Sequence, residues 1–424
     1  MELKNKKVTI IGAAKSGLAA AQLILELKGT PKISDKEPFE KLPKDVQSWI
    51  TKNKISAEYS GHIQKFIEDS DLLVISPGVR RDALPVQWAK AKKIPVMGEV
   101  ELAFRFCQRP VIAVTGSNGK TTVSTLIRDV IEKSGKKACL CGNVGNAFSN
   151  FVLRSQEYDY FVLEISSFQL ETIVDFKPFI AVFLNFNQNH LDRHADLEEY
   201  FQAKKRIFLN QGKNDFAVLN AADPAVSLLK KEVKAQVRYF NDPKVPQKFN
   251  NPNFLAALEV AKILNIKEDV CADVFTHFKG VEHRIEMVRN IHGVDFINDS
   301  KSTTAEAGRW ALERISKPII MICGGRDKHI DFTVLRDLVP KKVKKMFVIG
   351  ESKEKIKASY QDLIKVEECA TLQEAVTRAQ QSASTGDCIL LSPMCTSFDM
   401  FSNFEERGKV FKEIVNNLKE KALI

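Results

Sequence analysis

The sequence lacks any long apolar run. No stretch of about 18 consecutive apolar residues occurs, which excludes a membrane-spanning helix of ordinary length. Residues 1–7 lead directly into a short strand-like run, so the longer apolar stretch of a signal peptide is also missing. With neither feature present, we expect a cytoplasmic protein.

Cysteine is scarce and carries no recognisable pattern. Of the eight cysteines, Cys139 and Cys141 form a C-x-C pair, but no second pair lies at zinc-site spacing. In a reducing cytosol we expect most of them to be free and buried. Repeats, low-complexity tracts and Pro/Gly-rich linkers are also absent. At roughly 100–200 residues per domain, 424 residues predict two to four domains.

Positive charge is in excess, with a formal net charge of +10. Such an excess fits nucleic acid, a membrane surface or an anionic small substrate. Much of it is scattered lysine, as in residues 341–345, where a solvated face is the simplest interpretation. No nucleic-acid-binding module accompanies the charge, so we expect no nucleic-acid partner.

Three segments alternate strand-like and helical patterns. The expected strands are residues 8–11, 32–34, 72–75, 111–114, 160–163, 180–184, 319–322, 346–349 and 389–391. Strand–helix–strand alternation is typical of parallel sheets. We therefore predict an α/β protein with domains at residues 1–98, 99–281 and 282–424.

A phosphate-binding loop is the strongest single motif. Residues 115–122 read T-G-S-N-G-K-T-T between an apolar strand and a helix. Glycines let backbone N–H groups converge on phosphate oxygens at a helix N-terminus. Lys120 can reach the terminal phosphates and the Thr121 hydroxyl can bind Mg²⁺. Val114 occupies the place of the usual first glycine, yet the context predicts ATP or GTP binding. The candidate nucleotide-binding residues here are Gly116, Ser117, Asn118, Gly119, Lys120, Thr121 and Thr122.

Polar residues follow the next two strands of this segment. Glu164 comes directly after the strand at residues 160–163, and His190 lies in the loop beyond the strand at residues 180–184. Ligands of open α/β sheets bind at the carboxyl ends of the strands, where Glu164 is well placed to hold Mg²⁺ beside Thr121. Lys204 follows on a helix that, read alone, is an amphipathic surface helix.

Four motifs together resemble the Mur ligase family. They are T-G-S-N-G-K-T-T, E-I-S-S-F-Q-L-E at residues 164–171, N-H-L-D-R-H at residues 189–194 and Y-F-Q-A-K at residues 200–204. The resemblance spans essentially the whole chain, and residues 392–408 match the more selective signature of one branch of the family. It implies a Rossmann-like N-terminal domain for a UDP-linked substrate, a central P-loop ATPase domain and a Rossmann-like C-terminal domain for an amino acid.

The resemblance also implies a reaction. An ADP-forming ligase would activate the carboxylate of UDP-N-acetylmuramoyl-L-alanine as an acyl phosphate and join it to D-glutamate, a step of peptidoglycan synthesis. The cofactors would be ATP and two Mg²⁺ ions. We expect a monomer with no membrane span.

Residue roles carry over position by position. Lys120, His190 and Lys204 would be catalytic, and Lys204 would be carbamylated, which turns a cation into a metal-binding carboxylate. The implied metal ligands are Thr121, Glu164, His190 and Lys204; Asn250, Asn253, Arg284 and Asp299 would contact ATP. The implied substrate-binding residues are Lys15, Ser16, Asp35, Ser76, Gly78, Asn143, Ser166, Lys301, Thr303, Lys328, Ser397 and Phe404, of which Thr303, Lys328, Ser397 and Phe404 would hold D-glutamate.

Three features depart from the family pattern. Asn189 replaces the usual aspartate before His190. Ala14 replaces the second glycine of G-x-G-x-x-G and would crowd a dinucleotide pyrophosphate, which argues against NAD. Lys36 and Glu37 follow Asp35, where an arginine for the UDP end is expected; Lys15 and Ser16 are the candidates to compensate.

Other functions stay open at this level. One is a sibling ligase that adds a different amino acid, or a folate polyglutamate ligase. A nucleotide-dependent switch would need Lys120 and Thr121 but not Glu164, His190 and Lys204. A nicotinamide-dependent dehydrogenase would use the first segment and is opposed by Ala14.

Overall fold

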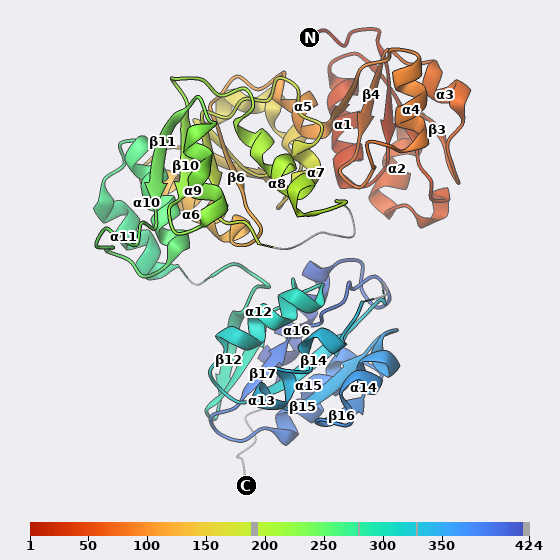
Figure 1. The fold of residues 1–424 in the computed structure, drawn as a ribbon. Helices are drawn as coiled ribbons and strands as arrows, with labels where there is room; N and C mark the ends of the chain where they lie inside the picture. The colour runs from red at the N-terminus through yellow and green to blue at the C-terminus, as the bar shows by residue number, and fades with distance from the viewer. Residues whose placement is uncertain (188–193, 279, 328–329, 419–424) are drawn as a thin grey trace. The chain divides into compact units, whose positions relative to one another are not determined.

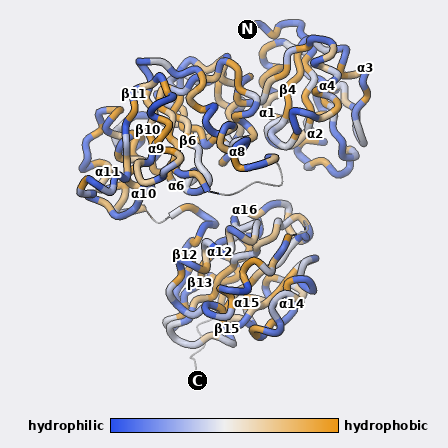
Figure 2. Tube along the Cα trace, in the orientation of Figure 1, coloured by the Kyte–Doolittle hydropathy of each residue, from blue (hydrophilic) through white to orange (hydrophobic). Residues whose placement is uncertain are grey.

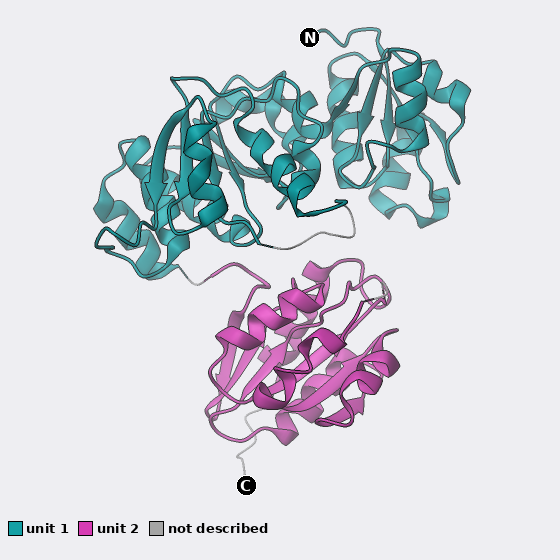
Figure 3. Ribbon diagram, viewed as in Figure 1, with its two compact units in different colours: residues 1–278 teal, residues 279–424 magenta. Residues whose placement is uncertain are grey.

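The computed structural model describes residues 1–187, 194–278, 280–327 and 330–418. It has three sheets with helices packed against them (Figure 1) and two compact units, Met1–Phe278 and Lys279–Ile424 (Figure 3). The expected α/β architecture with parallel sheets is confirmed. Among the described residues, no helix combines the length and the apolar composition that crossing a membrane requires.

The first sheet has the strand order β3-β2-β1-β4-β5, with all neighbours parallel. Its elements are β1 (Lys7–Ile11), α1 (Lys15–Glu26), β2 (Thr30–Ser34), α2 (Lys44–Lys52), β3 (Ser56–Glu58), α3 (Gln64–Glu68), β4 (Leu72–Ile75), α4 (Leu84–Ala91) and β5 (Val96–Gly98). Helix α5 (Glu99–Phe104) leads to the second sheet. Strand β4 is buried along its whole length, as helices on both faces of a sheet require.

The second sheet has the order β11-β10-β9-β6-β8-β7 and is also parallel. Its elements are β6 (Val111–Thr115), α6 (Lys120–Lys133), β7 (Ala138–Gly142), β8 (Tyr160–Glu164), α7 (Ser167–Leu170), β9 (Ile180–Phe183), α8 (Leu197–Lys205), β10 (Phe216–Asn220), α9 (Pro224–Ser227), β11 (Gln236–Phe240), α10 (Pro252–Ile263) and α11 (Glu268–His277). Figure 2 shows β4 and β6 coloured as hydrophobic, in keeping with strands that lie inside their domains.

One apolar core joins the first two sheets. It contains Val8 and Val74 from the first sheet together with Ala113 and Phe161 from the second. Helix α1 packs against α5 and against the short helical turn Phe148–Asn150, which belongs to the second sheet's layer. This continuous burial explains why residues 1–278 form a single compact unit.

The third sheet has the order β12-β13-β17-β14-β15-β16. Its elements are β12 (Glu286–Ile291), β13 (Val294–Asn298), α12 (Ala305–Arg314), β14 (Ile319–Gly324), α13 (Val339–Lys342), β15 (Val343–Ile349), α14 (Lys353–Tyr360), β16 (Lys365–Glu368), α15 (Leu372–Ser382), β17 (Cys388–Leu391) and α16 (Phe404–Asn416). Strand β12, which is not among the expected strands, runs antiparallel to β13, because a tight turn rather than a helix connects them.

The cysteines and the lysine-rich run at residues 341–345 are also the subject of predictions from the sequence. All eight cysteines are free and seven are buried, as expected. The lysine-rich run at residues 341–345 is only partly a solvated face. It enters β15, where Lys344 forms a 2.7 Å ion pair with Asp387 and Lys345 a 2.9 Å pair with Glu367.

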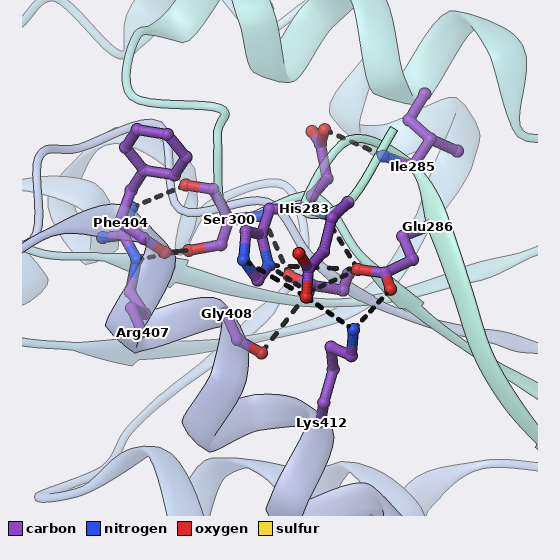
Figure 4. A network of polar contacts seen from close by, with 11 residues as sticks. His283, Ile285, Glu286, Ser300, Phe404, Arg407, Gly408 and Lys412 are labelled. Carbon is purple, nitrogen blue, oxygen red and sulfur yellow. Dashed lines mark hydrogen bonds and ion pairs between the residues drawn. The ribbon is translucent and has the colours of Figure 1, made fainter. Parts of the chain in front are cut away.

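A buried polar network ties the start of the third sheet to α16 (Figure 4). Glu286 accepts a hydrogen bond from the backbone N–H of His283 at 2.9 Å and from Lys412 Nζ at 2.7 Å. The side-chain amide of Asn298 lies 2.9 Å from His283 Nδ1, so that ring nitrogen accepts. Burial lowers the pKa of His283, which favours the neutral ring that this contact needs.

Asp299 lies beside this network and is only 4% exposed. Its carboxylate accepts hydrogen bonds from Ser392 Oγ at 3.0 Å and from the Ile285 backbone N–H at 3.2 Å. Burial nevertheless raises the pKa of Asp299 to about 7, against these hydrogen bonds and the positive charge of Arg284. The folded protein therefore holds a proton here that the unfolded chain releases near pH 4.

We predict that Asp299→Asn stabilises the fold more at high pH than at low pH. The folded-state pKa of about 7 exceeds the ordinary 3.8. Below the ordinary value both states are protonated, and above about 7 both states are charged and the folded state bears the full burial penalty. The wild type thus loses stability as pH rises through this window. In urea unfolding, the gain from asparagine should be about 2 kcal/mol larger at about pH 8.5 than at about pH 5.5.

The exposed Asp331 offers the matched control in the same unit. Its pKa is lowered by hydrogen bonds from Thr333. Asp331→Asn should therefore show no pH-dependent gain between the two conditions. An equal effect of Asp299→Asn at both pH values would contradict the raised pKa.

Candidate active site

The phosphate loop connects β6 to α6 and depends on two glycines. Gly116 has φ 153° and Gly119 has φ 84°, a left-handed conformation in which Gly119 also caps α6. A Cβ on Gly116 would lie 2.9 Å from Leu184 Cβ, and one on Gly119 would lie 2.7 Å from Asn253 Oδ1. Among the described residues, no side-chain hydrogen bond caps the N-terminus of α6. Its first N–H groups and its partial positive charge are therefore available to an anion.

Lys120 folds back over this loop. Its Nζ donates to the carbonyl oxygens of Gly116 at 2.9 Å and Ser117 at 3.0 Å. These carbonyls hold the ammonium beside the loop. Phosphate oxygens of a bound nucleotide would replace the carbonyls as its hydrogen-bond partners.

The segment after β9 braces the loop. Asn185 Oδ1 accepts from the Asn118 backbone N–H at 2.8 Å, and Asn185 Nδ2 donates to the Asn118 carbonyl at 3.1 Å. Ser117 Oγ donates to the Asn187 carbonyl at 3.0 Å and accepts from the Asn187 N–H at 2.9 Å. The sequence argument missed these asparagines, although the rule that singled out Glu164, a polar residue directly after a strand, applies equally to Asn185.

Glu164 ends β8 next to the loop and is 2% exposed, so it is not a solvated strand-end residue. Its Oε2 accepts from Thr121 Oγ1 at 2.7 Å and its Oε1 accepts from Asn143 Nδ2 at 2.7 Å. A hydroxyl and a carboxylate are the hard oxygen ligands that Mg²⁺ prefers. No group of three or more His, Cys, Asp or Glu side chains suited to a metal occurs among the described residues.

Lys204 is buried at 1% exposure near the end of α8, so the surface-helix interpretation is wrong for this side chain. Its Nζ donates to the Gly116 carbonyl at 2.9 Å and lies 4.6 Å from the centre of the Tyr200 ring. Burial lowers the pKa of Lys204 well below its usual range. The charge of Lys120 acts in the same direction and that of Glu164 opposes it.

Four side chains from three distant parts of the sequence thus meet around one loop: Lys120, Thr121, Glu164 and Lys204. His190, predicted to join them, lies outside the described residues. Asn253 begins α10 beside Gly119, and Asn250 is exposed just before that helix.

The candidate UDP-binding residues lie at the carboxyl edge of the first sheet. Asp35 follows β2 and accepts from the Ala13 backbone N–H at 2.6 Å, while Ser76 follows β4 and donates to the Gly12 carbonyl at 2.8 Å. Lys15 and Ser16 open α1, whose N-terminus has no side-chain cap. Gly78 follows Ser76 in the loop after β4.

Ser166 has a structural partner in addition to its predicted role. It caps α7 in a capping box with Gln169, accepting from the Gln169 N–H at 3.3 Å. This box was legible in the sequence as serine followed three residues later by glutamine.

The other predicted residues belong to the second unit. Lys301 Nζ lies 5.7 Å from the centre of the Phe404 ring, and Arg284 lies 5.9 Å from the Trp310 ring. Ser397 is 1% exposed and its Oγ has no hydrogen-bond partner among the described residues. Thr303 is half-buried just before α12, and Lys328 lies outside the described residues.

Models of known protein families match successive parts of this chain. Three family models match: a MurD-like N-terminal domain of Mur ligases at residues 6–98, the Mur ligase middle domain at residues 114–287 and the glutamate ligase domain of Mur ligases at residues 283–395.

Similar proteins and solved structures extend this result. The UDP-N-acetylmuramoylalanine–D-glutamate ligase of Thermoanaerobacter pseudethanolicus is 39% identical over 99% of this chain and 100% of the relative, and that of Koribacter versatilis is 38% identical over 99% of each. Among structures, UDP-N-acetylmuramate-alanine ligase from Thermotoga maritima has a TM-score of 0.58 at 18% identity, covering 98% of this chain and 100% of that one.

A second structure shares the fold at low identity. It is a bifunctional folylpolyglutamate synthase/dihydrofolate synthase from Yersinia pestis, complexed with AMPPNP and a manganese ion. Its TM-score is 0.55 at 14% identity, over 75% of this chain and 91% of that one. The full-length identity to the D-glutamate ligases, together with the three matching family models, shows that this chain belongs to the Mur ligase family.

Proposed function

We propose that this chain joins D-glutamate to UDP-N-acetylmuramoyl-L-alanine and converts ATP to ADP and phosphate, a step of peptidoglycan precursor synthesis. Relatives named for that reaction match the chain from end to end. The observation that carries the proposal is the meeting of Thr121, Glu164 and Lys204 at the phosphate loop, because this set goes beyond what nucleotide binding alone needs.

The three segments would divide the work. Residues 1–98 would hold the UDP end, residues 99–281 would hold ATP and residues 282–424 would hold D-glutamate. Asp35 and Ser76 support the first assignment because both lie at the ligand-binding edge of the first sheet. The unpartnered, buried Ser397 Oγ supports the last, since a buried hydroxyl without a partner suits a ligand.

ATP would bind with its phosphates on the loop and the N-terminus of α6. Lys120 would exchange its carbonyl partners for phosphate oxygens, and Thr121 with Glu164 would hold Mg²⁺. The family uses ATP and Mg²⁺, and a bound ion would neutralise the triphosphate so that a carboxylate can approach. The contact of Asn143 with Glu164 would bring the sugar-linked substrate to the same place.

The substrate carboxylate would attack the γ-phosphorus in line and displace ADP, which gives an acyl phosphate. The amine of D-glutamate would then attack the acyl carbon, lose a proton and expel phosphate through a tetrahedral intermediate. Positioning and charge stabilisation supply most of such catalysis. Arg284 and Asp299 keep their proposed role in ATP binding, and Lys301 its proposed role in substrate binding.

Lys204 would act as a carbamate. Its burial supports this role, because the lowered pKa favours the neutral amine, which is the form that adds CO₂. The resulting anion would suit the neighbourhood of Lys120 better than a second ammonium. With His190, the carbamate would bind a second Mg²⁺. The family's use of ATP and Mg²⁺ does not by itself require the carbamate or the second ion, which are the specific part of this proposal.

We predict that phosphate release requires both proposed substrates. Purified protein with ATP, Mg²⁺ and UDP-N-acetylmuramoyl-L-alanine should release phosphate with D-glutamate and not with L-glutamate, L-alanine or L-lysine. The reason is that the side-chain and backbone donors around Ser397 and Phe404 would match one set of carboxylates. Turnover with another amino acid would favour a sibling ligase, and turnover with a folate would favour a polyglutamate ligase.

We predict that Lys204→Ala lowers kcat by about 100-fold or more, because it removes a group that sets the charge at the phosphates. Lys204→Glu should perform no worse than the alanine variant. The neighbouring Lys205 is the matched control, since it points outward and pairs with Glu232. A near-wild-type rate for Lys204→Ala would remove the carbamate from the mechanism.

We predict that Lys120→Ala abolishes ADP formation, because it removes the ammonium that the Gly116 and Ser117 carbonyls hold at the loop, where it would neutralise the ATP phosphates. ADP would be followed with a coupled assay. Lys133→Ala changes an exposed lysine at the far end of the same helix and should leave the rate unchanged. ADP formation that persists in Lys120→Ala would exclude the loop from phosphate transfer.

A further inference from the structure

Helix α8, which carries Lys204, is flanked by two side chains that both bind α7. His194 lies two residues before Asp196, the N-cap of α8, and Arg206 is the C-cap of the same helix. Both reach the short helix that follows Glu164.

Arg206 holds the end of α7. Its Nε donates to the Leu170 carbonyl at 2.8 Å and its Nη2 donates to the Ile173 carbonyl at 2.7 Å. The Leu170 carbonyl is at the end of α7, where helix carbonyls have no partners inside the helix, and the Ile173 carbonyl lies three residues further along the chain. The guanidinium thus satisfies two groups that would otherwise need water. Burial lowers the pKa of Arg206, as does the nearby charge of Arg81, but a guanidinium stays protonated in this range.

His194 holds the start of α7. Its Nε2 lies 3.0 Å from Ser167 Oγ, and its Nδ1 lies 3.6 Å from a carboxylate oxygen of Glu171. The imidazole stacks on Phe168 at 5.5 Å and packs against the Tyr200 ring at 5.2 Å. At 2% exposure it is an interior connection rather than a surface contact.

These contacts connect the two groups that the proposed chemistry needs at a fixed separation. Ser167 follows Glu164 by three positions, and Arg206 follows Lys204 by two. Tyr200, which packs against His194, lies under the Lys204 ammonium at 4.6 Å. Helix α7 has four residues, too few for a helix that persists on its own. Its position therefore depends on contacts from outside the helix, which include the burial of Leu170 and the bonds at its two ends.

We propose that Arg206 and His194 form a clasp on α7 that fixes the distance between Glu164 and Lys204, and that both are positioning residues for the metal and phosphate chemistry. This inference rests on the proposed function. Neither side chain would touch ATP or a substrate. Each acts by holding one helix against another.

The test compares Arg206→Ala, Arg206→Lys, His194→Ala and the control Lys205→Ala in the full-length protein. Arg206→Ala should lower kcat by about 10- to 100-fold and raise the Mg²⁺ concentration for half-maximal rate. The KM for D-glutamate should change less than about twofold, because that substrate would bind the second unit. Arg206→Lys should recover part of the rate, since an ammonium can reach one of the two carbonyls. His194→Ala should shift the same two quantities in the same direction.

Amide hydrogen exchange tests the clasp independently of the proposed function. Amides of residues 167–173 should exchange faster in Arg206→Ala than in Lys205→Ala, whether or not the protein is an active ligase. Unchanged exchange and an unchanged Mg²⁺ requirement would overturn the clasp. So would a rate loss that only matches the loss of folded protein. An inactive wild type or a fully active Lys204→Ala would instead count against the proposed function, while the exchange result would still report on α7.

Discussion

The burial of one ammonium group organises the central part of this molecule. Lys204 is almost wholly removed from solvent, and it donates a hydrogen bond to the carbonyl of Gly116 inside the phosphate loop. Taking a charged amine out of water costs several kcal/mol unless its partners are arranged beforehand. The surroundings are arranged in that way: the Tyr200 ring lies 4.6 Å away, the Glu164 carboxylate acts on its charge, and the Gly116 carbonyl accepts a hydrogen bond from it.

The arrangement around the loop is made by the backbone as much as by side chains. Gly116 and Gly119 adopt conformations and close approaches that a Cβ would prevent, and the asparagine segment after β9 fixes the loop from the other side. Because folding already orients these groups, they need little rearrangement when charge develops during the reaction. The same logic explains why α8 needs attachment at both ends, since a small shift of Lys204 would change every distance in the group.

Much of this could be predicted from the sequence. The strands that precede the loop and Glu164 are continuous apolar runs, and parallel sheets bring their carboxyl ends to one edge, so the neighbourhood of Thr121 and Glu164 follows from pattern alone. The burial of Lys204 did not follow, because its helix has an amphipathic pattern that is equally typical of a surface. Nor did β12, whose antiparallel pairing depends on a tight turn at Gly293 rather than on hydrophobic periodicity. Contacts such as Arg206 to two carbonyls leave no trace in a single sequence, because any long cation could occupy such a position.

The apolar core shared by the first two sheets limits how this chain can be divided. Val8 and Val74 of the first sheet and Ala113 and Phe161 of the second belong to one buried cluster. A fragment that began at residue 99 would expose the half of that cluster which the first sheet normally covers, and exposed apolar surface of this kind promotes association between molecules. The first domain is thus poorly suited to exchange between proteins. The last unit has its own separate cores, so it is better suited to serve as an interchangeable module.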